Sequence, residues 1–141
     1  MPTIEEIEAE RAARKAALAA QRLEQLATDL QALNELEIQH GDGKIVRVDI
    51  GRYVPGLPTM VIMRLPKPVE FKRYTDMIAA RGDSPGEQLN PSIMLAESCR
   101  LYPAEKEDYE RVKAEFTGLH INAAVALRKA CEGSAVEEGK G

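Results

Sequence analysis

The feature that most constrains this chain is the stretch from Thr3 to Glu35, which contains no Gly and no Pro. Thr3 and Glu6 have the spacing of a capping box, in which each side chain accepts a hydrogen bond from the other residue's free backbone N–H, so we predict a helix that begins here. At 1.5 Å of rise per residue, a helix of about 33 residues is about 50 Å long. A compact chain of 141 residues has a diameter below about 40 Å. We therefore expect the helix to extend beyond the body of the protein.

Small and aliphatic residues recur along this helix in alternating steps of three and four, the heptad pattern typical of coiled coils. The first half of the pattern contains only Ala and the second half only Leu, so the Leu half should supply most of the binding energy, at ~1.5–3 kcal/mol per fully buried Leu. We predict that this face binds a protein partner or a second copy of the chain; the alternative is that the helix folds back over its own domain. The pattern, called the heptad seam below, begins with Ala9 and Ala12, and its predicted binding residues are Ala16, Ala19, Leu23, Leu26, Leu30 and Leu33.

The next part of the sequence predicts a small three-stranded antiparallel sheet. Apolar and polar residues alternate over 36–39 and, more loosely, over 45–50, and the segment 59–65 is rich in residues typical of strands. His40-Gly41-Asp42-Gly43 indicates a hairpin turn between the first two strands. Pro66 and Pro68 end the third strand, since neither can donate to a ladder.

The remainder predicts about four helices, over residues 68–81, 91–101, 104–117 and 121–131. Asn90 and Pro91 suit the N-cap and first turn of the second of these, and Gly133 suits the end of the last. The predicted fold is α+β, with a long helix over 1–35, a core domain over 36–133 and a disordered tail over 134–141. The aromatic and aliphatic residues that we expect in one core are Phe71, Tyr74, Leu95, Tyr109, Val112, Phe116 and Leu127.

We expect a cytoplasmic protein. The first residues contain neither a basic segment nor an apolar segment of a secretory signal, and no stretch approaches the ~18 apolar residues of a membrane span. Cys99 and Cys131 lack metal-type spacing, so we expect free thiols in a reducing compartment.

The motifs of common catalytic sites are missing from the sequence, which contains no phosphate loop, dinucleotide fingerprint or paired-Cys metal site. Cys99 paired with His40 or His120 has no local signature of a nucleophile and its base. The acidic residues from Glu105 to Glu110 suit a solvated face near a helix N-terminus better than an acidic site. We therefore predict a protein that is not an enzyme and uses no cofactor or metal.

The charge is unevenly distributed along the chain. Residues 44–81 carry eight Lys and Arg against three Asp and Glu, whereas the segments on both sides are acidic. A basic segment of this kind can bind nucleic acid, but it is small and lacks a matching motif. We expect it to face acidic neighbours or an acidic protein partner, and a nucleic-acid-binding regulator stays as an alternative.

The order of motifs from Lys44 to Gly133 resembles the tail assembly chaperones of long-tailed bacteriophages and related tail-like particles. The motifs are a strand ending in Met63-Arg64-Leu65-Pro66, a helix with Phe71-Lys72-Arg73-Tyr74, and a small-residue helix ending in Ser98-Cys99-Arg100-Leu101-Tyr102-Pro103. An acidic amphipathic helix and an Ala-rich helix follow. The resemblance covers about two thirds of the chain and implies binding of the tape-measure protein, which such chaperones keep soluble, and recruitment of tail-tube subunits. The heptad helix at the N-terminus departs from this pattern and keeps a structural subunit of a tail or particle as an alternative.

Overall fold

The computed structural model describes the backbone of residues 1–81 and 85–140, and the side chains of residues 1–80 and 90–132. It confirms the predicted α+β class, with a long N-terminal helix, a three-stranded antiparallel sheet and further helices. In chain order the elements are α1 (Ile4–His40), the short 3-10 turn η1 (Asp42–Lys44), β1 (Ile45–Asp49), β2 (Met60–Arg64), α2 (Pro68–Arg81), α3 (Pro85–Ser98), β3 (Arg100–Tyr102), α4 (Lys106–Glu115) and α5 (Leu119–Lys140).

Helix α1 begins where the capping box predicts and ends later than expected. The backbone N–H of Glu6 donates to the Thr3 hydroxyl at 3.1 Å. The predicted strand over 36–39 is wrong, because these residues continue the helix to His40. The predicted hairpin turn is also wrong: Gly41 caps the helix with a φ of 100° and donates its N–H to the Glu37 carbonyl at 2.8 Å. Extending an existing helix adds one hydrogen bond for each residue that is fixed, so a four-residue alternation did not suffice to start a strand.

The third strand of the sheet comes from a distant part of the chain. The strand order is β1-β2-β3 and both pairs are antiparallel. Strand β3, predicted as the end of a helix, lies beside β2 with Tyr102 opposite Ile62 and a register irregularity between Ile62 and Met63. Three residues carry too little pattern to predict a strand, so only the long-range pairing reveals it.

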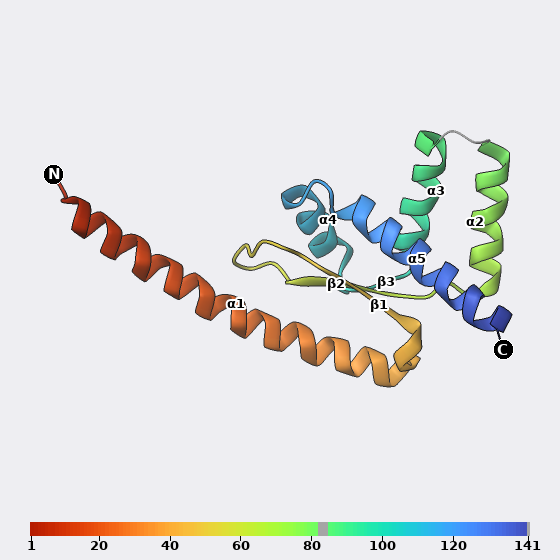
Figure 1. Ribbon diagram of the computed structural model, residues 1–141, viewed down its shortest axis with the longest axis horizontal. Helices are drawn as coiled ribbons and strands as arrows, with labels where there is room; N and C mark the ends of the chain where they lie inside the picture. The colour runs from red at the N-terminus through yellow and green to blue at the C-terminus, as the bar shows by residue number, and fades with distance from the viewer. Residues whose placement is uncertain (82–84, 141) are drawn as a thin grey trace.

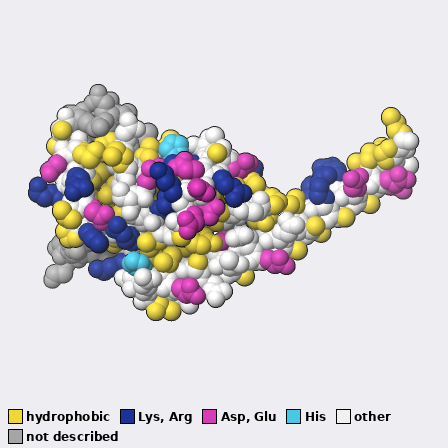
Figure 2. Space-filling model, turned by 180° about the vertical axis from the view of Figure 1, so that it is seen from behind, with side chains coloured by type: hydrophobic (Ala, Val, Ile, Leu, Met, Phe, Trp, Pro, Cys, Tyr) yellow, Lys and Arg dark blue, Asp and Glu magenta, His cyan; other side chains and the backbone are white. Residues whose placement is uncertain are grey.

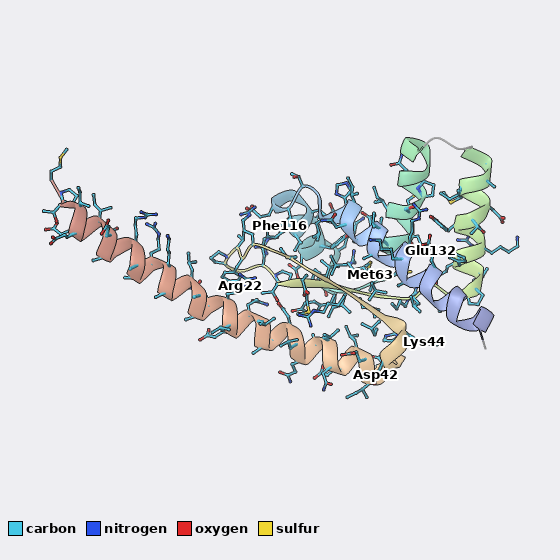
Figure 3. The ribbon with its side chains drawn as sticks, viewed as in Figure 1. Arg22, Asp42, Lys44, Met63, Phe116 and Glu132 are labelled. Atoms are coloured by element: carbon cyan, nitrogen blue, oxygen red, sulfur yellow. The ribbon has the colours of Figure 1, made fainter. Side chains whose placement is uncertain are left out.

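The sheet lies between α1 on one face and the other helices on the opposite face (Figure 1). Because side chains alternate along a strand, Val61 and Met63 of β2 join the main core, while Met60 and Ile62 point to the face that α1 covers. All four are 0–1 % exposed, so β2 is buried on both faces. Figure 3 labels Met63 within this central layer.

The main core contains most of the residues that the sequence predicted for it. Tyr74, Leu95, Tyr109, Val112 and Leu127 are buried in one cluster with residues of β1, β2, α3 and α5. Two predicted members differ. Phe116 is half-buried at the end of α4, and Phe71 is 38 % exposed on α2, where its ring lies 5.8 Å from that of Tyr74. Both rings lie at the edge of the core, where the helix periodicity that predicted them cannot distinguish an edge position from a central one.

Of the helices that follow β2, α2 has the bounds that the sequence predicted, and the bounds of the other three differ from the prediction. Helix α3 begins at Pro85, so Asn90 is not its N-cap and Pro91 lies inside it. The sequence places residues 82–90 between two helices, and of these 82–84 lie outside the described residues. Helix α4 is shorter than predicted. Helix α5 continues through Gly133 and Gly139 to Lys140, in place of the predicted tail, since each interior Gly costs only about 1 kcal/mol. Across residues 1–81 and 85–140, no helix has the length and apolar composition needed to cross a membrane.

Candidate partner-binding surface

The first part of α1 extends from the body as a projecting arm, defined here as residues 4–24. Every side chain from Met1 to Glu24 is exposed, and contact with the body begins at Gln25. At 1.5 Å per residue the arm is about 32 Å long, and it carries the N-terminus far from the body (Figure 1). Arg22 lies close to the point where the helix reaches the body (Figure 3). Within the part of the chain that the structure describes, nothing packs against this length of helix, so its whole surface is accessible.

The residues of the heptad seam fall into two groups. Ala16 and Ala19 are exposed on the arm, and Leu23 is 67 % exposed beside the body. Leu26 and Leu33 are half-buried where α1 covers the sheet, whereas Leu30 between them is 40 % exposed. The straight helix has 3.6 residues per turn and the seam repeats every 3.5, so the face that touches the body and the seam diverge. The accessible part of the predicted surface is therefore the arm with Leu23 and Leu30.

A buried carboxylate that the sequence analysis did not single out attaches α1 to the sheet. Asp29 is 0 % exposed. Its Oδ1 accepts from Gln25 Nε2 at 2.9 Å and from the Tyr102 hydroxyl, and its Oδ2 accepts from the Thr59 backbone N–H at 2.7 Å and the Thr59 hydroxyl at 2.5 Å. Burial, and to a smaller extent the hydrogen bond to Asp29, raises the pKa of Tyr102, so its hydroxyl stays protonated and donates. These four residues form the Asp29 network, which joins α1, the residue before β2, and β3.

This network sets the direction in which the arm leaves the body. Hydrogen bonds to a charged or buried acceptor are directional and stronger than neutral ones. Leu26, Leu33 and Leu36 are half-buried, and apolar burial is not directional, so these residues constrain the orientation of α1 less than the network does. The sequence offered one local signal, an Asp in the interior of a helix beside an aliphatic seam, but it could not identify the donors.

A second group of charges attaches α2 to the end of β2. The Arg64 guanidinium binds both carboxylate oxygens of Glu70, at 2.7 and 3.0 Å, and the Lys67 backbone N–H donates to Glu70 at 2.7 Å. The hydrogen bonds from Arg64 and then Lys67 lower the pKa of Glu70 to about 2. Burial raises the pKa of the nearby Cys99 thiol to about 11 although Arg64 Nη1 lies 3.8 Å from its sulfur. A protonated, buried thiol is a weak nucleophile.

Lys113 of α4 stands at the centre of a third charged group. Its Nζ lies 2.8 Å from Glu97 of α3 and 3.0 Å from Glu110, and these partners raise its pKa. The same nitrogen lies 5.1 Å from the Tyr109 ring centroid, and the Arg100 guanidinium lies 4.9 Å from that centroid. The Lys113–Glu97 pair thus links α4 to α3, whereas Glu110 pairs with Lys113 within α4 itself.

The basic segment 44–81 is partly neutralised by its own neighbours. Among residues 44–80, whose side chains are described, ion pairs with carboxylates form in four places: Arg47–Asp49 at 2.7 Å, Arg52–Glu115 at 3.4 Å, Arg64–Glu70 at 2.7 Å and Lys72–Asp76 at 3.1 Å. Phosphate contacts would have to replace these pairs. The segment therefore offers a weaker basic surface than its composition suggests.

A shallow apolar hollow lies between α2 and α3. It has a volume of about 140 Å³, and Tyr74, Met77 and Leu95 are among the side chains that line it. Met94, also in its lining, is 54 % exposed, and on α5 Val125 is 40 % exposed. Of the helices around Ile93 and Val125, which the sequence suggests as further binding surfaces, the first thus exposes Met94 and the second exposes Val125 and Ile121.

The two histidines were the remaining candidates for a chemical role. The residues with described side chains contain no group of three or more His, Cys, Asp or Glu placed to hold a metal ion. His40 is half-buried at the end of α1, and His120 is half-buried in the first turn of α5. In comparisons with family models, curated proteins and solved structures, no match to this chain was found.

Proposed function

We propose that this protein is a chaperone of the phage tail assembly type, which binds a helical segment of the tape-measure protein along its projecting arm and recruits tail-tube subunits. The observation that carries the proposal is the arm itself. Residues 4–24 form continuous helix with every side chain exposed. An exposed helix with an Ala and Leu seam is a surface on which a second helix can pack, with side-chain anchors at steps of three and four residues.

The composition of the arm suits reversible binding. Ala side chains permit two helices to approach closely but bury little apolar area, so the binding free energy per residue is small. Leu23 and Leu30 add the largest apolar side chains of the exposed seam. An assembly factor must release its partner when the tail forms, and a modest interface permits this release.

The body supports the proposal by holding the arm in a fixed direction. The Asp29 network and the half-buried Leu26 and Leu33 attach the second half of α1 to the sheet. The partner helix therefore meets a surface that is already helical, and less conformational entropy is lost on binding. The exposed Met94 and Val125 provide apolar positions on the body for further contacts with a partner.

Coexpression with the candidate tape-measure protein of the same genome tests this function. The variant Ala16→Glu/Ala19→Glu places two charges on the seam, and Ala17→Glu is the matched control because it lies away from the seam on the same exposed arm. Each buried charge weakens binding by about tenfold or more. We expect wild type and Ala17→Glu to keep the tape-measure protein soluble and copurify with it, and the double variant to lose both effects. Equal solubility with all three proteins, or with none, would contradict the proposal.

Analysis of purified particles separates this function from that of a structural subunit. A chaperone leaves the tail during assembly, so the protein should be present in infected or producing cells and absent from the finished particle. Quantitative mass spectrometry of purified particles measures this ratio. Several copies per particle would favour the structural subunit.

A further inference from the structure

From Glu5 to Arg22 the charged side chains of the projecting arm are separated by sign; the exposed Glu24 at the base of the arm lies outside this pattern. Glu5, Glu6, Glu8 and Glu10 occupy the end of the arm, and Arg11, Arg14, Lys15 and Arg22 follow, as the magenta and dark blue groups along the arm in Figure 2 illustrate. All eight are exposed, and none of them forms an ion pair within the described part of the chain. The arm is therefore complementary to a helix with the same charges in reverse order, which is a second arm running in the opposite direction.

Three of these residues lie in one column beside the seam. Glu8, Lys15 and Arg22 are seven residues apart and each directly precedes a seam residue. When two helices pack antiparallel along their seams, the columns on the same flank face each other. When they pack parallel, this column faces the opposite flank, which carries uncharged Ala at the corresponding positions. Only the antiparallel arrangement gives the charged column a charged partner.

We propose that two copies of this protein associate through antiparallel arms, with Glu8 of each protomer paired to the partner's Lys15. This register forms two symmetric ion pairs and brings Ala9 and Ala12 of both arms to the centre of the contact. A shift by one heptad would pair Glu8 with the partner's Arg22 but place the two Lys15 side chains against each other. It would also press the partner's first turn toward Leu26, which already contacts the body.

The size of this contact predicts a weak dimer. The overlap spans about 16 residues, or about 24 Å, and Ala side chains bury little area. The interface then falls below the ~1,200 Å² that is typical of stable complexes. We expect a dissociation constant on the order of 10–100 μM. Such a dimer covers the arm in the absence of another partner, and it can form whether or not the proposed chaperone function is correct.

Sedimentation equilibrium of the purified full chain tests the arrangement with charge reversals. Glu8→Lys gives two Lys–Lys contacts, and Lys15→Glu gives two Glu–Glu contacts, so each variant alone should dimerise about tenfold more weakly or worse. The double variant Glu8→Lys/Lys15→Glu restores opposite charges, as does an equimolar mixture of the two single variants. We expect both to regain the wild-type affinity within about threefold.

Two further variants control for net charge. Glu10→Lys and Arg14→Glu change the charge by the same amounts on the side of the arm away from the seam, and they should leave dimerisation within about threefold of wild type. Circular dichroism should show equal helix content for all variants, since these side chains make no contact with the body.

Three results would overturn the proposal. Wild type that stays monomeric well above the expected dissociation constant excludes the dimer. Lys15→Glu that dimerises as wild type does excludes this register. A mixture of Glu8→Lys and Lys15→Glu that does not associate excludes the paired columns. A monomeric wild type that still solubilises the tape-measure protein would remove the dimer and leave the proposed function intact.

Discussion

Replacement of Asp29 by Asn tests how much the buried carboxylate contributes to the attachment of α1. The amide has nearly the same shape but replaces one acceptor oxygen with an NH₂ donor. Each carboxylate oxygen receives two donors, so either orientation of the amide leaves two donors facing an N–H group. The hydroxyls of Tyr102 and Thr59 can rotate, and Gln25 is half-buried and can turn to solvent. The backbone N–H of Thr59 cannot move, so the amide nitrogen should replace Oδ1.

The expected cost follows from the hydrogen bonds that are lost or weakened. A hydrogen bond to a charged group contributes about 1.5–3 kcal/mol, and a buried donor without an acceptor costs about 1–3 kcal/mol. With rotation of the hydroxyls relieving part of this penalty, we expect Asp29→Asn to lower the free energy of unfolding by about 2–4 kcal/mol. That is a large share of the 5–15 kcal/mol typical of a small protein. Asp49→Asn is the matched control, because its side chain is 66 % exposed and the change should cost less than about 0.5 kcal/mol.

Two measurements check this prediction. Urea titration followed by far-ultraviolet circular dichroism gives the free energy of unfolding of each variant. Hydrogen exchange of the Thr59 amide reports on the attachment of α1 directly, since this N–H donates to Asp29 and is exposed when the helix separates from the sheet. A loss below about 0.5 kcal/mol together with unchanged protection of Thr59 would refute the role assigned to Asp29.

Three further changes have calculable outcomes. The pKa of Glu70 is lowered to about 2 in the folded protein, so its pairing with Arg64 stabilises the fold fully above about pH 4.5 and progressively less as the pH falls toward 2. In urea titrations, Glu70→Gln should therefore lower the free energy of unfolding by about 1–2 kcal/mol near neutral pH and by much less near pH 2.5. Leu127→Ala, at a fully buried position, should cost about 2–5 kcal/mol, whereas Val125→Ala at a 40 % exposed position should cost under about 1 kcal/mol; equal losses in denaturant titrations would contradict the assigned core. The pKa of Cys99 is raised to about 11, so its thiol should be alkylated about 100-fold more slowly in the folded protein at pH 8 than in urea. Peptide mass spectrometry measures both rates, and equal rates would place Cys99 at the surface.

The sequence by itself determined the elements whose signals are local. The capping box of Thr3 and Glu6 and the absence of Gly and Pro through Glu35 are enough to predict the start and continuity of α1, because helix hydrogen bonds join residues four apart. Helix periodicity likewise identified Tyr109 and Val112 as inward-facing residues of α4. The length of α1 against the diameter of a compact chain already implied that the helix extends beyond the body.

Only the tertiary structure decided the features that depend on residues far apart in sequence. Asp29 accepts hydrogen bonds from Thr59 and Tyr102, which lie 30 and 73 positions away in the sequence. Strand β3 exists because β2 pairs with it. The end of α1 was also decided in this way, since the half-buried Leu36 and Glu37 remain helical against the body. No local pattern contains these partners, and their pairing requires that the chain first close the long loops between them. The accessible part of the heptad seam therefore became visible only when the body was placed against one side of the helix.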